Sequence, residues 1–231
     1  MAEKLEKMAE FFERRLDIYE EHQMSAIESA EEFYRKTAEL LPRSAGAKVL
    51  DLGCGTGLEL DFYYPLNRGA QITGIDLSRR MLDVLAEKFA KYRPELICAS
   101  YFDVDFGREK YDAAVSVESL HHFPYEKKVP LYGRIREALR TGGAFILTDY
   151  TAPDEEAEKE NFCELARRKR AEGLGEEEFY HFDTPLTAER ECRALSEAGF
   201  SRVEVLGKWA NTALIRAEKQ SGAVQPRKDR F

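Results

Sequence analysis

Three glycines stand at alternate positions in the segment VLDLGCGTGLEL, which begins at residue 49. Gly53, Gly55 and Gly57 directly follow a short apolar stretch. Glycine adopts backbone torsions that other residues avoid, and it lets main-chain N–H groups approach a ligand closely. A helix that begins after such a loop also favours a carboxylate or a phosphate at its N-terminus. The loop therefore predicts a ligand held against the main chain.

The spacing of these glycines does not fit two common ligand loops. A dinucleotide loop follows the pattern G-x-G-x-x-G, and Leu58 and Leu60 stand where its third glycine would be in the two possible registers. A Walker A loop contains Gly-Lys, and no lysine follows any of the three glycines. Asp76 ends the next apolar stretch, about 20 residues beyond the loop, where a carboxylate can accept hydrogen bonds from the two hydroxyls of a ribose.

Alternating strands and helices are expected to position these residues. Apolar stretches predict strands at residues 47–53, 70–76, 95–100, 111–117 and 144–150, and a closing hairpin of strands at 201–207 and 210–217 that turns at 207–209. Helices lie between them, with Ser78 and Thr187 as N-caps. Another helix is predicted over 129–142, with Pro130 in its first turn and Gly142 as its C-cap. This order predicts a parallel sheet with helices on both faces and a ligand beyond the carboxyl ends of its strands.

Two amphipathic helices precede the first strand. Apolar residues recur at helical spacing over the first twenty residues, and again from about residue 24 to residue 41. We expect the break between these helices at YEEHQM, residues 19–24, where Tyr19 and His22 would hinge a lid over the strand ends.

Composition limits the class of protein. The chain has 231 residues, enough for one sizeable domain, and 43% of them are hydrophobic. The chain has no long apolar run, so no membrane span is predicted. Its N-terminus is too highly charged for a signal peptide. The four cysteines are scattered without metal-type spacing, which is typical of reduced thiols in a cytoplasmic protein. The net charge of −8 argues against a polyanionic partner.

The order acidic-apolar-G-x-G-x-G at residues 51–57 resembles motif I of the class I S-adenosylmethionine-dependent methyltransferases. The resemblance extends over residues 45–217, because Asp76 and the closing β-hairpin follow in the order of that family. It implies a Rossmann-like, doubly wound α/β fold, with a mostly parallel seven-stranded sheet and a C-terminal antiparallel β-hairpin. It also implies that S-adenosyl-L-methionine donates a methyl group to an acceptor by in-line displacement.

The resemblance also implies which residues bind the cofactor. They are Asp51, Gly53, Cys54, Gly55, Thr56, Gly57, Asp76, Leu77, Met81, Ser100, Tyr101, Val117 and Glu118. Family members often carry an acidic residue after the third strand that receives the adenine amino group, whereas this chain has Ser100 there. The adenine contact could therefore come from Ser100, from the backbone at Tyr101 or from Asp103.

Candidates for accepting a proton from the acceptor are His121, His122, Glu118 and Tyr150. Adjacent side chains on an extended backbone point opposite ways, so we expect at most one of the two histidines to face the ligand. Candidates for a lid or an acceptor pocket are Tyr19, His22, Tyr180 and His181. Because no cluster shows metal-ligand spacing, we expect no metal.

The predicted organisation has three parts. Residues 1–44 form a helical lid and residues 45–218 the methyltransferase domain, in which 151–184 are a helix and loop inserted near the substrate site. Residues 219–231 are predicted to be a flexible tail.

Three functions fit these residues. A small-molecule methyltransferase, as a monomer or homodimer without membrane contact, suits the acidic charge best. A tRNA or other nucleic-acid methyltransferase would need a basic surface beside the site. The residues available for it are Arg167, Arg168, Lys169, Arg170, Arg227, Lys228 and Arg230. The third possibility is a non-catalytic protein that binds S-adenosylmethionine.

Overall fold

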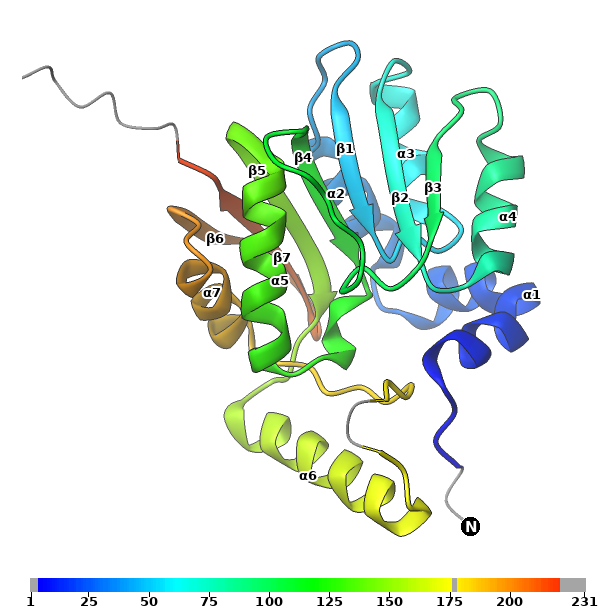
Figure 1. Cartoon of the computed structure of the whole chain (residues 1–231), viewed down its shortest axis with the longest axis vertical. Coiled ribbons are helices and arrows are strands. Elements are labelled where there is room, and N and C mark those ends of the chain that lie inside the picture. Colours follow the sequence, from blue (N-terminus) through cyan, green and yellow to red (C-terminus); the bar gives the residue numbers. More distant parts are fainter. Residues whose placement is uncertain (1–3, 176–177, 221–231) are drawn as a thin grey trace, which may run out of the picture.

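A seven-stranded sheet forms the centre of the computed structural model, which describes residues 4–175 and 178–220 (Figure 1). Its strand order is β3-β2-β1-β4-β5-β7-β6. The strands are β1 (Lys48–Leu52), β2 (Gln71–Asp76), β3 (Glu95–Cys98), β4 (Tyr111–Val117), β5 (Leu139–Tyr150), β6 (Arg202–Trp209) and β7 (Thr212–Glu218). Neighbours among β1 to β5 are parallel, whereas β7 is antiparallel to both β5 and β6. The predicted α/β fold with its antiparallel hairpin is confirmed.

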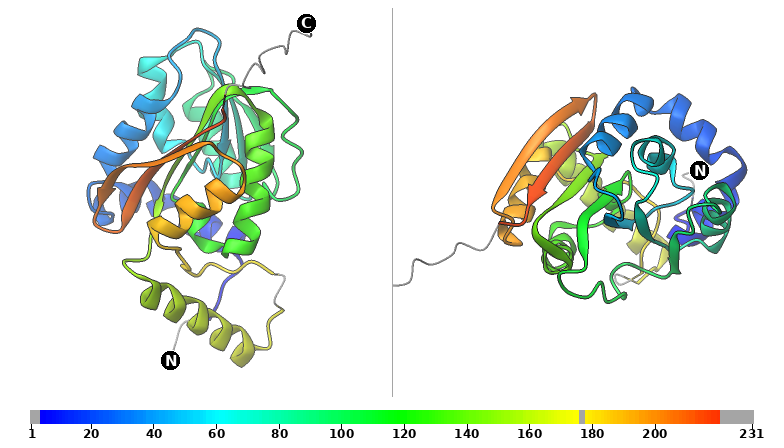
Figure 2. Two further views of the ribbon diagram at one scale, coloured as in Figure 1. Left: turned by 90° about the vertical axis from the view of Figure 1, so that its left-hand side faces the viewer. Right: turned by 90° about the horizontal axis from the view of Figure 1, so that it is seen from above.

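Helices cover both faces of this sheet. They are α1 (Met8–Ala26), α2 (Ala30–Leu40), α3 (Leu58–Leu66), α4 (Arg79–Lys88), α5 (Tyr125–Ala138), α6 (Glu155–Glu172) and α7 (Ala188–Glu197), with a short 3₁₀ turn, η1 (Leu120–His122). The helices α5 and α7 lie on one face, and α2 and α3 lie on the other (Figure 2). The helix α6 lies beyond the carboxyl ends of the parallel strands (Figure 1).

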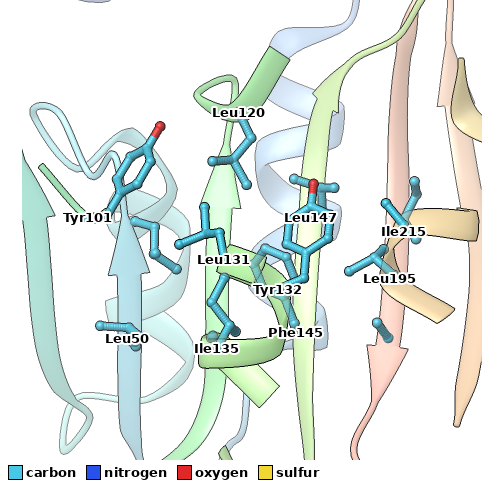
Figure 3. Packing of buried hydrophobic residues seen from close by; sticks show 14 of the residues in the cluster. Leu50, Tyr101, Leu120, Leu131, Tyr132, Ile135, Phe145, Leu147, Leu195 and Ile215 are labelled. Carbon is cyan, nitrogen blue, oxygen red and sulfur yellow. The ribbon is translucent and has the colours of Figure 1, made fainter. Parts of the chain in front are cut away.

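Strand β5 contributes buried side chains to the hydrophobic clusters on both faces of the sheet. Phe145 and Leu147 are fully buried against Tyr132 of α5 (Figure 3), whereas Ile146 belongs to the opposite cluster, with Phe33 of α2. Successive strand residues point to opposite faces, so a strand covered on both sides is apolar throughout. This buried framework fixes the strand ends, where the site forms.

Two predicted N-caps are confirmed. Ser78 Oγ accepts a hydrogen bond from the Met81 N–H at 3.2 Å, and Thr187 Oγ1 accepts one from the Arg190 N–H at 3.2 Å. Each bond satisfies one of the amide groups that a helix start leaves unpaired.

The boundaries of α5 differ from those predicted. The helix begins at Tyr125, so Pro130 lies in its second turn. It ends at Ala138, because Leu139 already pairs with Tyr111 of β4, and Gly142 therefore lies within β5 instead of capping the helix. Pairing with the neighbouring strand outweighs the local glycine signal.

The predicted break between the first two helices is also wrong. Helix α1 continues through residues 19–24 to Ala26, and the chain turns at residues 27–29, with Ser29 in the left-handed region at φ 60°. The segment YEEHQM contains no glycine or proline, and polarity alone does not end a helix.

The closing hairpin also turns later than predicted. Strand β6 runs on to Trp209, which pairs with Thr212, so the turn is formed by Ala210 and Asn211. Lys219 follows β7 and its N–H donates to the Gly143 carbonyl, so the predicted flexible tail does not begin there. Its remaining part, residues 221–231, lies outside the described residues.

Candidate active site

The glycine loop joins β1 to α3 and has an unusual backbone. Gly53, Gly55 and Gly57 all lie at positive φ, at 70°, 49° and 74°. A Cβ atom on Gly57 would also lie only 2.9 Å from the ring of Phe89. Residues with a side chain rarely adopt such torsions, and this requirement explains the alternate glycine spacing.

Asp76 ends β2 directly beside this loop. Its Oδ2 accepts a hydrogen bond from the Gly55 N–H at 2.9 Å, and its Oδ1 accepts one from the Ser78 N–H at 2.8 Å. Burial raises the pKa of Asp76, although these two N–H groups lower it. Each carboxylate oxygen has a second lone pair, so Asp76 can also accept two vicinal hydroxyls of a ribose.

A narrow cavity of about 50 Å³ lies between the glycine loop and Asp76, and we call it the cofactor cleft. Seven of the predicted cofactor residues line it: Gly53, Gly55, Asp76, Leu77, Met81, Tyr101 and Glu118. Six further residues do so as well: Met8, Phe12, Tyr19, Ser119, His122 and Phe123. Main-chain donors, a carboxylate and apolar walls match the polar and apolar parts of S-adenosylmethionine in kind. Because about 50 Å³ is far below the roughly 300 Å³ at which ligand pockets begin, the cleft must open to admit the cofactor.

The other predicted cofactor residues lie outside the lining of this cleft. They are Asp51, Cys54, Thr56, Gly57, Ser100 and Val117. Ser100 Oγ accepts a hydrogen bond from the Phe102 N–H at 3.2 Å and so stabilises its own turn. Tyr101 is the member of that turn that reaches the cleft.

Asp51 belongs to a buried carboxyl pair behind the glycine loop. Its partner is Glu59 of α3, and the two side chains are only 1% and 4% exposed. Burial raises the pKa of both groups, and for Asp51 the charge of Glu59 and the hydrogen bond between them raise it further. In this structure the motif acid is thus buried beside Glu59 and does not line the cofactor cleft.

A larger cavity of about 530 Å³ adjoins the cofactor cleft, and the two share Phe12, Tyr19, Glu118 and His122 in their walls. All four predicted catalytic candidates line the large cavity, as do Tyr19, His22 and His181 among the predicted lid residues. Tyr180 does not line it, and its hydroxyl donates to Glu178 at 2.5 Å.

Both histidines of the adjacent pair face this cavity, so the expectation that at most one would do so is wrong. His121 and His122 lie in the 3₁₀ turn η1, and their ring centroids are 4.0 Å apart. Successive side chains alternate by half a turn only on an extended strand, whereas a 3₁₀ turn has three residues per turn. Strand β4 has already ended at Val117.

Two carboxylates flank His121. Its Nδ1 lies 2.6 Å from Asp149 Oδ1, and its Nε2 lies 3.5 Å from Asp183 Oδ1. Burial alone lowers the pKa of His121, but the two carboxylates outweigh it and raise the pKa to about 10. Burial and the charge of His121 hold the pKa of His122 well below its usual range, and burial lowers that of His181 to about 4.

Glu118 stands where the two cavities meet. Its φ is 49°, in the left-handed region that residues with side chains rarely adopt. Its N–H donates to the Thr148 carbonyl at 2.8 Å, and its Oε1 accepts from the Thr212 hydroxyl at 3.1 Å. Burial raises the pKa of Glu118 to about 7. Such backbone strain is typical of functional sites.

Several residues of the large cavity or its border were not among the site residues predicted from sequence. Trp209, Phe11 and Asp183 line the cavity, and Asp149 holds His121. Asp149 offered a signal, because it is an acid at the end of a predicted strand. Phe11 and Asp183 lie in segments that were expected near the site, but no local pattern singled out these two residues. Nothing in the sequence indicated that the β6–β7 hairpin would bring Trp209 to the cavity.

Helix α1 covers both cavities, whereas α2 does not. Tyr19 and Phe12 of α1 line both, and Lys88 of α4 pairs with Glu20 of α1 at 3.0 Å. In contrast, Phe33 of α2 is fully buried in the core beside α3. Of the two helices predicted to form the lid, α1 therefore lies over the cavities and α2 packs in the core.

Comparisons with known proteins identify relatives of this chain. The methyltransferase domain family matches residues 49–143, which hold the glycine loop, Asp76 and the histidine pair. The carboxy-S-adenosyl-L-methionine synthase of Helicobacter hepaticus is 28% identical over 188 residues, covering 77% of this chain and 78% of that protein. The family match, this relative and the solved structures support a class I S-adenosylmethionine-dependent methyltransferase.

Two further relatives of this methyltransferase are longer than it. The erythromycin 3''-O-methyltransferase of Saccharopolyspora erythraea is 28% identical over 77% of this chain and 58% of its own length. A crystal structure of a possible O-methyltransferase from Nostoc punctiforme is 25% identical, with a TM-score of 0.63, over 81% of this chain and 56% of that one. The methyltransferase thus spans little more than half of either protein. Within its described residues, no helix has the length and apolar character needed to cross a membrane.

Proposed function

We propose that this methyltransferase transfers the methyl group of S-adenosylmethionine to a small-molecule acceptor bound in the large cavity. The observation that carries the proposal is the junction of the two cavities at Glu118, His122 and Tyr19. A donor in the cleft and an acceptor in the large cavity would meet there. A cavity of about 530 Å³ is of the size that small molecules occupy in proteins.

The cofactor side of the proposal rests on the glycine loop and Asp76. The N–H groups of the loop and the Asp76 carboxylate would hold the polar groups of the cofactor, and Leu77, Met81 and Tyr101 would pack on its apolar parts. When bound, S-adenosylmethionine supplies a methyl group already activated on a sulfonium. The chain then needs mainly to align donor and acceptor and to exclude water.

The walls of the large cavity support an acceptor with an apolar or aromatic body and a polar reacting end. Phe11, Phe12, Tyr150 and Trp209 supply aromatic surface. The polar residues of the lining include Glu118, whose Oε1 accepts a hydrogen bond from the Thr212 hydroxyl. An acceptor hydroxyl would find hydrogen-bonding partners there, and one relative is named an O-methyltransferase.

The surroundings support the remaining parts of the proposal. Helix α1 would act as the lid, and the inserted residues 151–184 contribute His181 and Asp183 to the cavity wall. All four cysteines are free, which supports a cytoplasmic location. A nucleic-acid acceptor has less support, because Arg167 and Arg168 both pair with Glu164.

A second candidate is a reaction on the cofactor itself. A relative that covers 77% of this chain is named a carboxy-S-adenosyl-L-methionine synthase, and its name describes a modified cofactor as product. The large cavity would then hold the co-substrate instead of a methyl acceptor.

One experiment tests both candidates. The protein is incubated with S-adenosylmethionine and a panel of small phenols, alcohols, amines and carboxylic acids, and all products are identified by mass spectrometry. We expect S-adenosylhomocysteine together with an acceptor that has gained one methyl group. A modified cofactor without S-adenosylhomocysteine would favour the second candidate, and a failure to bind the cofactor would overturn both.

A further inference from the structure

We propose that His121, His122 and Asp183 hold one divalent transition-metal ion in the wall of the large cavity. His121 Nε2 lies 3.5 Å from Asp183 Oδ1, and His122 Nδ1 lies 3.3 Å from the same oxygen. One ligand atom from each of the three residues lies within 4.8 Å of the others. Ligand atoms about 2.0–2.2 Å from a tetrahedral ion are about 3.3–3.6 Å apart, so these two distances already fit shared coordination.

Asp149 presents His121 in the orientation that a metal ligand requires. It lies 2.6 Å from Nδ1 of that ring, and this hydrogen bond leaves Nε2 facing Asp183. The carboxylate is itself fixed, because its Oδ2 accepts from the Leu120 N–H at 2.9 Å and its Oδ1 from the Tyr150 N–H at 3.0 Å. A carboxylate that orients a histidine in this way is a common outer partner in metal sites.

The backbone also holds the two ligand segments together. The Thr184 N–H donates to the His121 carbonyl at 3.1 Å, and its hydroxyl lies 3.4 Å from the same oxygen. These contacts join η1 to the segment that carries Asp183, although the two are about sixty residues apart in sequence. The three ligands are therefore positioned by the fold itself.

The donor set indicates which ions would bind. Two imidazole nitrogens and one carboxylate oxygen suit zinc, iron, cobalt or nickel better than magnesium or calcium, which prefer oxygen ligands. Both histidine side chains are buried, whereas Asp183 is 48% exposed and lines the large cavity. A third imidazole, that of His181, has its ring centroid 5.0 Å from that of His122.

Three protein ligands leave at least one coordination position for a water or an acceptor atom. Here that position would face the large cavity, beside Glu118 and the cofactor cleft. An acceptor hydroxyl bound to the ion would lose its proton more readily, since a bound cation stabilises the resulting anion. This use of the ion rests on the proposed function, but the metal site itself does not.

Metal binding by the whole chain tests the site directly. Protein treated with a chelator and then dialysed is titrated with Co²⁺ by calorimetry and by visible absorption, with Zn²⁺, Ni²⁺ and Mn²⁺ as further probes. We expect one Co²⁺ per chain, with a spectrum that lacks the thiolate charge-transfer band a cysteine ligand would add. His122→Ala and Asp183→Asn should each weaken Co²⁺ binding more than tenfold, and Asp149→Asn by about 10- to 100-fold.

The matched control is His22→Ala, because His22 also lines the large cavity but is not a member of the cluster. Its Co²⁺ affinity should equal that of the unaltered protein. Circular dichroism and cofactor affinity are measured for every variant, so that a misfolded protein or a failure of the proposed function is recognised separately. If no probe ion binds, or if Co²⁺ binds equally well to His122→Ala and Asp183→Asn, the metal site is refuted and the cluster is an ion-pair network.

Discussion

The cofactor cleft and the large cavity share a wall but are built in different ways. The core of the cleft is one strand, one loop and the end of the next strand, since Gly55 and Asp76 are joined by a direct hydrogen bond. The large cavity draws its wall from α1, η1, the end of β5, the segment after α6 and the β6–β7 hairpin. In the cleft the backbone supplies much of the chemistry, whereas in the cavity side chains from distant segments supply it.

This difference predicts how each region responds to change. Cofactor binding that depends on the backbone is abolished by a single added side chain. Loss of cofactor binding then prevents the reaction with every acceptor alike. Chemistry that depends on side chains can be altered one residue at a time and changes which acceptor fits. The two regions should therefore be separable by mutation, although they meet at Glu118.

The largest effect is expected for Gly55→Val. Gly55 lies at φ 49°, and a Cβ atom there would lie 3.5 Å from the Tyr19 hydroxyl, so a β-branched side chain would strain the loop and fill the cleft. Calorimetry should detect no binding of S-adenosylhomocysteine, while circular dichroism stays close to that of the unaltered protein.

Gly133→Val provides the control for that change. Gly133 lies in α5, and a Cβ atom there would meet no atom within 4 Å, so cofactor binding should persist. A folded Gly55→Val protein with normal affinity would show that the loop does not hold the cofactor.

Asp76→Ala should have the next largest effect. Removing a charged acceptor of ribose hydrogen bonds should weaken S-adenosylhomocysteine binding by about 1.5–3 kcal/mol, measured by calorimetry. Asp83→Ala, an exposed change on α4, should leave the affinity unaltered. Equal affinities for these two variants would remove Asp76 from the cofactor site.

Trp209→Ala should separate the two regions. Trp209 lines the large cavity but not the cofactor cleft. Loss of its aromatic surface should raise the KM of the acceptor about tenfold, or about 1.4 kcal/mol, while cofactor affinity stays constant. Steady-state kinetics with each substrate varied in turn would measure this, and a matching loss of cofactor affinity would mean that the cavities do not act independently.

The smallest effect is expected behind the glycine loop, for Glu59→Gln. Burial raises the pKa of Asp51 and Glu59 in the folded protein, so the folded state binds protons more tightly than the unfolded chain. Stability should then fall as the pH rises from about 4 through the folded pKa values. Glu59→Gln removes one of the two acids, so it should raise the free energy of unfolding by about 1 kcal/mol at pH 7 and have little effect below about pH 4.

Urea denaturation across that pH range measures the difference between the two proteins. Glu160→Gln, at an exposed position of α6, is a control that keeps both buried acids. A constant difference at every pH would show that the carboxyl pair does not titrate on folding.

The sequence was informative wherever a few neighbouring residues determine the outcome. The structure confirms the predicted succession of strands along the chain, the helix caps Ser78 and Thr187, and the unusual torsions of the glycine loop. All of these follow from local torsions and burial. The break between α1 and α2 was misplaced because helix ends depend weakly on polarity and strongly on the path of the chain. The turn that aims both His121 and His122 inward was missed because the strand ends before it.

The amino-acid sequence by itself determined the fold, the family resemblance and the glycine loop, because local torsions and alternating burial depend on the types of consecutive residues. Only the tertiary structure decided that Asp183 would lie 3.3 Å from the His122 ring and that α1 would cover both cavities. Those contacts join segments that are far apart in the chain, and their distances depend on how the whole core packs. No spacing along the sequence records them.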